Sequence, residues 1–155
     1  MIVEELKSKG IFRIYSRNTK TNEVKKVGEI NNLIMNDTLD TLINIYANTS
    51  PDLELKYLAI GDGNTAVSGS DETLDNEVFR TAYDTRTKTN TGEITSVFYI
   101  LDSDYSGSIE EIGIFGGSTA GAGADSGTLI ARVLWSYTKS ASEELYITRI
   151  DRITA

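Results

Sequence analysis

The sequence predicts a mainly β protein, an antiparallel β-sandwich of the jelly-roll kind with one packed α-helix and an N-terminal β-hairpin. Short segments of alternating apolar and polar residues recur along the chain, with turn-forming residues between them. Only one segment carries apolar residues at helical spacing. The length of 155 residues fits one domain, with the hairpin at residues 1–31 and the sandwich at residues 32–155.

The N-terminal hairpin is predicted from two strands around a polar turn. Residues 10–17 alternate large apolar with polar side chains, as a half-buried strand does. Residues 18–22 favour a turn, and residues 23–30 are predicted to return from it. Residues 1–32 carry a net charge of +3, and the remainder of the chain carries −11. Segments of opposite sign favour head-to-tail contacts between copies, so the hairpin is either an assembly arm or a solvated surface.

The helix is predicted at residues 34–48. Its apolar residues recur at helical spacing and form one stripe: Met35, Leu39, Leu42, Ile43 and Tyr46. Asn36 and Asp37 supply hydrogen-bond acceptors near its start, and Ser50–Pro51 favours its end. We expect a sheet, or a groove between sheets, to cover the stripe, which makes this a core helix.

The rest of the chain is predicted to be β. The six expected strands are 57–60, 77–88, 93–101, 108–115, 128–138 and 143–153. Residues 89–92 form a hairpin turn in which Asn90 or Gly92 takes positive φ. Trp135 alternates with Leu129 and Val133, which favours a core position for it. The connections 61–76 and 116–127 are long for a compact domain, and we expect them to become ordered against neighbouring copies.

The composition excludes several classes of chemistry. The sequence has no cysteine and no histidine, so disulfides, thiolate or imidazole metal sites and the familiar serine and thiol hydrolases cannot form. The net charge of −8 argues against nucleic acid as a partner. No apolar run approaches the roughly 20 residues that span a bilayer, and residues 1–7 lack the apolar core of a secretory signal. We expect no cofactor and no membrane partner.

A calcium-like pattern occurs at residues 102–109. Asp102, Asp104 and Ser106 place oxygen atoms at the first, third and fifth positions of a loop, and a glycine follows at the sixth. The twelfth position is Gly113, where a calcium loop needs a glutamate, and the flanking segments are predicted strands. Aspartate and serine also hydrogen-bond the backbone of turns, so we predict a turn with at most weak calcium affinity.

Charged and aromatic residues suggest three further roles. Arg80 and Arg132 lie at the ends of β segments with acids nearby, where a buried arginine–carboxylate pair would fix the register between strands. Glu110 and Glu111 are adjacent on a strand and point to opposite faces, so a glycosidase pair would need distant segments. The eight tyrosines and Trp135 have flat rings that can stack on sugars.

Five stretches between residues 32 and 132 together resemble a module of tail-fibre and baseplate-appendage proteins of tailed phages. They are Asn32–Asn36, Tyr57–Thr65, Thr73–Arg80, Ile109–Phe115 and Gly127–Arg132. The resemblance implies a structural role in the virion, with no activity, cofactor or catalytic residue. Related chains continue into long fibre or receptor-binding segments. This one stops after one domain, so we expect an adaptor, collar, tail or baseplate subunit.

The expected function is therefore that of a structural, non-enzymatic subunit of a tailed-phage virion, assembled in the cytoplasm of the bacterial host. Its expected partners are copies of itself and other phage structural proteins. The first alternative is a glycan-binding module for the host surface. The second is an enzyme that acts on polysaccharide through carboxylates brought together from distant segments.

Overall fold

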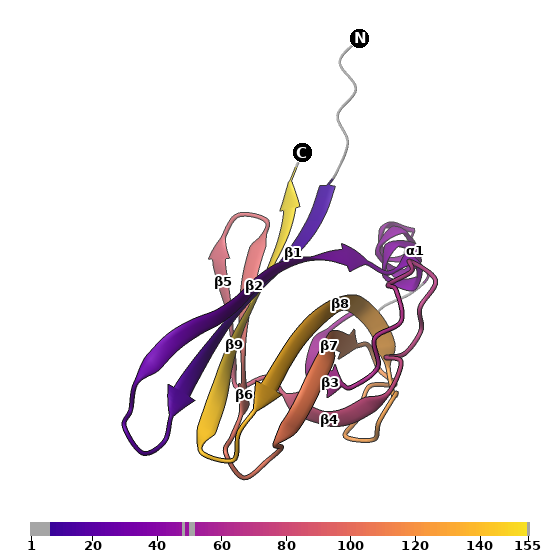
Figure 1. Cartoon of the computed structure of the whole chain (residues 1–155). Helices are drawn as coiled ribbons and strands as arrows, with labels where there is room; N and C mark the ends of the chain where they lie inside the picture. Colours follow the sequence, from indigo (N-terminus) through magenta and orange to yellow (C-terminus); the bar gives the residue numbers. More distant parts are fainter. Residues whose placement is uncertain (1–6, 48, 50–51, 155) are drawn as a thin grey trace.

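The computed structural model describes residues 7–47, 49 and 52–154. In this part of the chain, nine antiparallel strands form a curled sheet, and one helix lies beside it (Figure 1). The elements are β1 (Lys7–Asn18), β2 (Val24–Ile34), α1 (Asn36–Tyr46), β3 (Leu55–Gly61), β4 (Glu77–Ala82), β5 (Thr85–Asn90), β6 (Glu93–Ile100), β7 (Gly107–Gly116), β8 (Thr128–Lys139) and β9 (Glu143–Thr154). The strand order is β4-β3-β7-β8-β2-β1-β9-β6-β5. The predicted mainly β class is confirmed.

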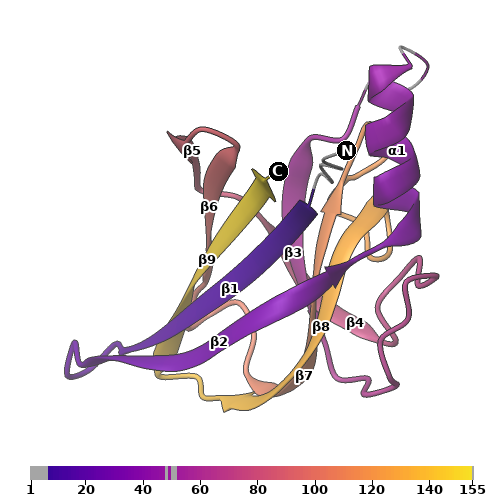
Figure 2. The same ribbon diagram turned by 90° about the horizontal axis from the view of Figure 1, so that it is seen from above.

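The predicted two-sheet sandwich is wrong, because the strands form one sheet that curls into a half-barrel. β2 is the cause: it pairs with β1 along most of its length and then with β8 at Leu33 and Ile34. Since a single strand is hydrogen-bonded to both halves, the halves do not separate into two stacked sheets. Figure 2 shows β2 running from the hairpin at one end of the molecule to α1 at the other.

The predicted strand 77–88 is two strands, and they form the two opposite edges of the sheet. β4 pairs with β3, whereas β5 pairs with β6. Between them, the N–H of Tyr83 donates to the carbonyl of Lys56 at 3.1 Å and the N–H of Asp84 to that of Val97 at 2.8 Å. The chain thus crosses directly from one edge of the curled sheet to the other.

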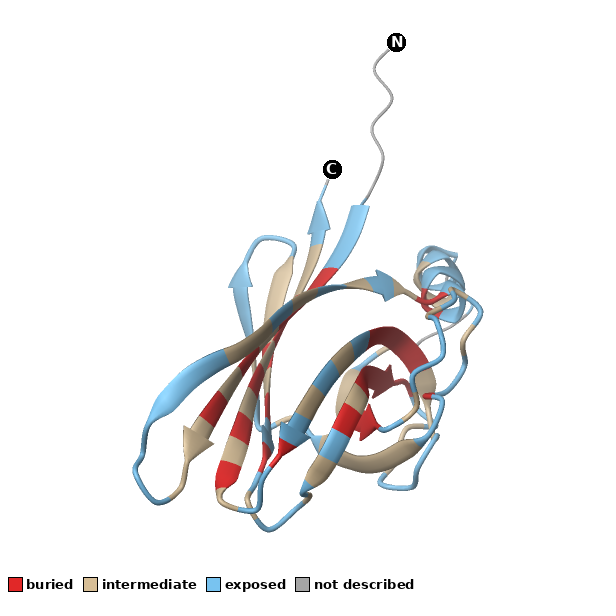
Figure 3. Ribbon diagram, in the orientation of Figure 1, coloured by how far each residue is buried: buried red, intermediate tan, exposed pale blue. Residues whose placement is uncertain are grey.

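The core fills the inside of the curl. Its buried side chains come from both halves of the sheet: Phe12, Ile14, Leu58, Ile60, Phe98, Ile100, Ile109, Ile112, Ile114, Ile130, Ala131, Val133, Leu145 and Ile147. Along β1 and β9, buried residues alternate with more exposed ones (Figure 3). Because strand side chains alternate between two faces, the same strands present a second, solvent-facing set on the outside.

The helix is shorter and more exposed than predicted. Ile34 belongs to β2, Met35 is the N-cap without a side-chain hydrogen bond, and Asn48 and Ser50–Pro51 lie outside the described residues. Met35 and Thr38 are buried, and the Thr38 hydroxyl donates to the Leu129 carbonyl at 3.3 Å.

Most of the apolar stripe of α1 faces away from the sheet. Leu39, Ile43 and Tyr46 are 45%, 66% and 75% exposed, so the prediction of a core helix is wrong. The curled sheet is already filled by its own side chains, which leaves the helix at its margin beside β8 (Figure 1). No helix in the described part of the chain has the length and apolar character to cross a membrane.

Trp135 connects β8 to β2 beyond the two positions at which these strands pair. A Cβ atom on Gly28 would lie 2.8 Å from the Trp135 Nε1 atom and 3.2 Å from Cε2, so the ring lies directly against this glycine of β2. On its own strand, Trp135 stacks on Tyr137 with ring centroids 4.9 Å apart. Glycine at position 28 therefore lets the indole close the seam between the two halves.

Replacing Gly28 with valine should displace the indole and destabilise the protein by about 1–3 kcal/mol, the usual cost of overpacking. Trp135 is the single tryptophan, so its fluorescence spectrum reports the displacement while a thermal melt reports the stability. Gly123→Val is the matched control, because a Cβ atom at Gly123 meets nothing within 4 Å. Equal melting temperatures and spectra for the two variants would contradict this account of the seam.

Candidate functional site

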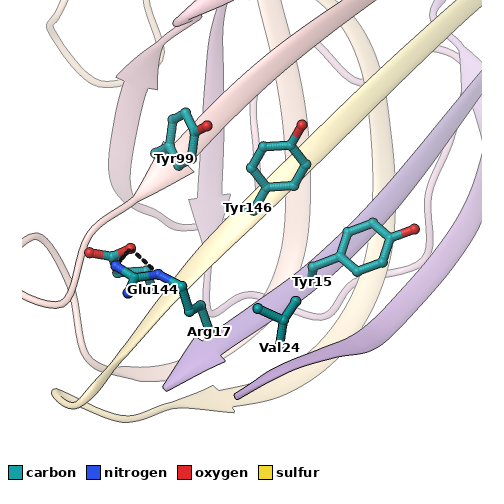
Figure 4. A pocket seen from close by; sticks show the side chains of 6 residues that line it. All are labelled: Tyr15, Arg17, Val24, Tyr99, Glu144 and Tyr146. Carbon is teal, nitrogen blue, oxygen red and sulfur yellow. Dashed lines mark hydrogen bonds and ion pairs between the residues drawn. The ribbon is translucent and has the colours of Figure 1, made fainter. Parts of the chain in front are cut away.

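Three tyrosines from adjacent strands form a row on the outer face of the sheet. Tyr15 on β1 lies directly opposite Tyr146 on β9, and Tyr146 lies opposite Tyr99 on β6. The ring centroids are 6.1 Å apart for Tyr15–Tyr146 and 5.3 Å for Tyr99–Tyr146, both edge-to-face (Figure 4). On either side of each tyrosine the chain points a buried residue inward, which fixes the rings outside. We call these residues the tyrosine row.

The tyrosine row lines an open groove with a volume of about 460 Å³. Val24 of β2, which is 60% exposed, adds an apolar wall, and Arg17 and Glu144 form one edge (Figure 4). Arg17 donates from Nη2 and Nε to Glu144 Oε2 at 2.6 and 3.2 Å. The groove thus combines a strip of aromatic rings with a fixed ion pair at its rim.

The charges around the tyrosine row are paired with each other. Arg13 lies 3.6 Å from Glu29, which also forms an ion pair with Lys26, and Arg17 is held by Glu144. The hydrogen bonds of Lys26 and the charges of Lys26 and Arg13 hold the pKa of Glu29 below its usual value. Little unpaired charge is left on this face to attract a charged ligand.

The phenol groups of the tyrosine row keep their hydrogen-bonding capacity. Within the described residues, the hydroxyls of Tyr15, Tyr99 and Tyr146 form no hydrogen bond, unlike those of Tyr105 and Tyr137. Partial burial, with the nearby Tyr146, Asp84 and Glu144, raises the pKa of Tyr99 above its usual value of 10.0. This hydroxyl therefore stays protonated at neutral pH, able both to donate and to accept.

The exposed residues of α1 form a second candidate surface, at the other end of β2. We call Leu39, Ile43 and Tyr46 the helix stripe. Asp37 and Asp40 lie on the same helix, which carries no basic residue. Neither acid forms an ion pair within the described part of the chain. The helix stripe is an apolar surface with Asp40 at its margin beside Ile43, whereas Asp37 lies in the first turn on the opposite face.

The buried polar cluster around Glu143 is the group best equipped for chemistry. The Glu143 carboxylate accepts hydrogen bonds from the Ser16 hydroxyl, from the Tyr137 hydroxyl at 2.7 Å and from the Ser140 N–H at 2.6 Å. Burial raises the pKa of Glu143, but these hydrogen bonds and the charge of Lys139 outweigh it and hold the pKa below 4.5. A carboxylate of lowered pKa is a weak general base, so the cluster is suited to joining the β8–β9 turn to β1.

Arg132, one of the two arginines singled out in the sequence, is almost fully buried between β7 and loop 62–76. Its Nε donates to Glu111 Oε2 at 2.8 Å and its Nη1 to Asp71 Oδ2 at 2.9 Å. Glu111 also accepts from the backbone N–H groups of Asp75 and Asn76 at 3.0 and 2.8 Å. The pair therefore joins β7 to β8 and holds the loop, whereas Glu110 points to the other face.

Arg80 holds the second long loop. Its Nε donates to Glu77 Oε1 at 2.8 Å, and its Nη1 donates to the carbonyls of Gly121 and Ser126 at 2.9 and 3.0 Å. Its guanidinium carbon lies 4.5 Å from the centroid of the Phe115 ring. Both long loops are thus held by arginines of the same chain, whereas the sequence led us to expect that neighbouring copies order them.

The calcium-like residues form a turn between β6 and β7. Asp102 Oδ1 accepts from the N–H of Ser103 at 2.9 Å, and Asp104 Oδ2 accepts from that of Leu101 at 2.9 Å. Ser106 is exposed, and Gly107 takes a φ of 138°. Among the described residues, no group of three or more potential ligand side chains is placed to hold a metal ion.

Sequence reasoning missed the tyrosine row as a site. Alternation predicts that Tyr15, Tyr99 and Tyr146 each lie on a strand, but only the pairing of β1, β9 and β6 aligns them. Comparisons with protein-family models, with curated proteins and with solved structures found no match for this chain.

Arg132→Ala should lower the free energy of unfolding by about 3–5 kcal/mol, because it leaves the carboxylate of Glu111 buried without its partner. Chemical denaturation measures this loss, and hydrogen exchange should become faster in residues 62–76. Arg13→Ala serves as the control, since it removes an exposed pair with Glu29. If Arg132→Ala left the denaturation midpoint unchanged, this arginine would have no role in stability.

Glu143→Gln should make stability less dependent on acid pH. Because the folded-state pKa of Glu143 lies below 4.5, its ionised form stabilises the protein above that pH, and this contribution disappears as the pH falls through the folded value. The variant should be less stable than the wild type at neutral pH, with the difference shrinking below about pH 4.5. A difference that stays constant in urea denaturation from pH 7 to pH 3 would show that the cluster does not depend on this charge.

Proposed function

We propose that this chain is a structural subunit of a tailed-phage virion and assembles head to tail, with the helix stripe of one copy packed against the basic hairpin of the next. The assignment to tailed phages is supported by the order of the five stretches between residues 32 and 132. The assembly mode is supported chiefly by one observation, the uncovered apolar stripe of α1.

The helix stripe needs a partner for physical reasons. An isolated helix shorter than about 12–15 residues is marginal in water, and α1 has 11 residues. Within the chain, Met35 and Thr38 are its buried anchors. Leu39, Ile43 and Tyr46 form a continuous apolar surface at helical spacing, which is the surface an amphipathic helix buries. A neighbouring subunit that covers it would stabilise both the helix and the assembly.

Charge complementarity points to the hairpin of another copy as that partner. The first 32 residues carry a net charge of +3, and Lys20 and Lys25 near the turn form no ion pair within the described residues. Asp37 and Asp40 at the helix are likewise unpaired there. The hairpin turn and α1 lie at opposite ends of β2 (Figure 2).

A contact between opposite ends of a molecule is heterologous and repeats from copy to copy. Such contacts generate rings when the rotation closes and filaments when it does not. Rings and filaments of this kind build collars, tails and baseplates, which is why the proposed contact supports a structural role in the virion. Other phage structural proteins would meet the outer surfaces of such a ring.

Ile43→Lys should weaken self-association by at least about tenfold, because it places a positive charge in the helix stripe, opposite the basic hairpin of the next copy. Light scattering over a range of protein concentrations measures the association. Thr87→Lys adds the same charge to an exposed position of β5 and should change nothing.

Exchanging charges tests the direction of the contact. Lys25→Glu and Asp40→Lys should each weaken association at low salt, and the double variant should recover part of it. A wild-type protein that stays monomeric at every concentration, or an association that Ile43→Lys leaves unchanged, would contradict the proposed function.

A further inference from the structure

We propose that the tyrosine row binds an uncharged oligosaccharide that lies across β6, β9 and β1. This inference goes beyond the assembly role and rests on a different surface, so either can fail without the other. A host-surface glycan as its source follows from the proposed function.

The spacing of the row suits a chain of sugars. Tyr99, Tyr146 and Tyr15 lie on one line perpendicular to the strands, with neighbouring ring centroids 5.3 and 6.1 Å apart. These distances are comparable to the length of one sugar residue in an extended chain, so successive sugars meet successive tyrosines. The apolar faces of the sugars would pack on the rings.

The tilt of the rings adds a preference among glycans. The interplanar angle is 60° for Tyr15–Tyr146 and 65° for Tyr99–Tyr146, so the rings form steps rather than a flat platform. Steps fit a chain whose sugars are rotated relative to each other. We therefore expect helical glucans, such as α-1,4- or β-1,3-linked chains, to bind better than the flat β-1,4-linked chain.

The rim provides hydrogen bonds in a fixed geometry. Arg17 is held on two sides, by Glu144 and by Asn22, whose Oδ1 accepts from Nη1 at 2.8 Å. Side chains that are already ordered lose little conformational entropy on binding. With the phenol hydroxyls, they give the groove donors and acceptors that match sugar hydroxyls on both sides.

The charges favour an uncharged ligand. Arg13, Arg17 and Lys26 are all paired with Glu29 or Glu144, and the chain as a whole carries −8. A polyanion would have to compete with these carboxylates and would be repelled by the protein as a whole. A neutral chain meets neither obstacle.

The narrowness of the strip favours a glycan over a protein. Polar residues bound the tyrosine row on both sides. Arg17 and Glu144 lie opposite each other in the strand register on one side, and Arg13 and Thr148 lie opposite each other on the other side. A stable protein interface buries more than about 1,000 Å² around an apolar centre. The tyrosine row is one side chain wide and therefore fits a single linear sugar chain better than a protein surface.

Titration of the full chain with maltohexaose, laminarihexaose and cellohexaose, followed by NMR, tests the inference, together with an array of bacterial surface polysaccharides. Binding of maltohexaose or laminarihexaose should shift signals of the tyrosine row, with cellohexaose weaker. Tyr146→Ala should weaken binding by about fivefold to tenfold, as expected for the loss of one aromatic contact. Tyr146→Phe keeps the ring and should retain most of the affinity.

Tyr46→Ala on α1 is the matched control and separates the two proposals. It removes an exposed tyrosine outside the groove, so glycan binding should persist while self-association weakens. Absence of binding to all three oligosaccharides and to the array, or binding that Tyr146→Ala leaves unchanged, overturns the inference. A loss of self-association in Tyr146→Ala would also overturn it, since the row would then be a protein interface.

Discussion

The arrangement of the molecule depends on the double pairing of β2. This strand forms hydrogen bonds with β1 over most of its length and with β8 at its end, so it holds the two halves of the sheet in one curl. The curl encloses a core built from both halves and is filled by its own side chains. As a consequence, α1 remains at the margin with its stripe exposed, and the outer faces of β1, β9 and β6 remain open to solvent. Both candidate surfaces follow from this one constraint.

The alternation of apolar and polar residues predicts the strands well because it indicates which side of each strand is buried. It carries no information on which strands are neighbours. For this reason residues 77–88 were predicted as one strand, although Tyr83 and Asp84 separate two strands at opposite edges. The same limit explains why a sandwich was expected in place of a curled sheet. It also explains why Tyr15, Tyr99 and Tyr146, which come from distant segments, could not be recognised as a row.

Residue type carries more information about the buried arginines than about the helix. An arginine among inward-facing residues of a strand must meet a carboxylate or carbonyl groups, since an unpaired buried charge is too costly. The sequence singles out Arg80 and Arg132 because acids lie near them at the ends of their β segments, but it misses Arg149, which is also fully buried. Only the structure shows that Arg80 and Arg132 hold loops 117–127 and 62–76. In contrast, the spacing of Leu39, Ile43 and Tyr46 predicts an apolar stripe on the helix. The same spacing would occur whether the stripe packs against its own chain or against another subunit.

The two proposed surfaces are compatible because side chains on a strand alternate between faces. Val24 lies in the groove of the tyrosine row, on the same side of the hairpin as its partner Arg17. Lys25, the next residue, pairs with the buried Ser16 and points to the opposite side. A neighbouring helix stripe that docks on the side of Lys25 therefore leaves the groove open. Repetition of the subunit would then place many grooves on one particle, and weak binding at each groove would become strong attachment through multivalency.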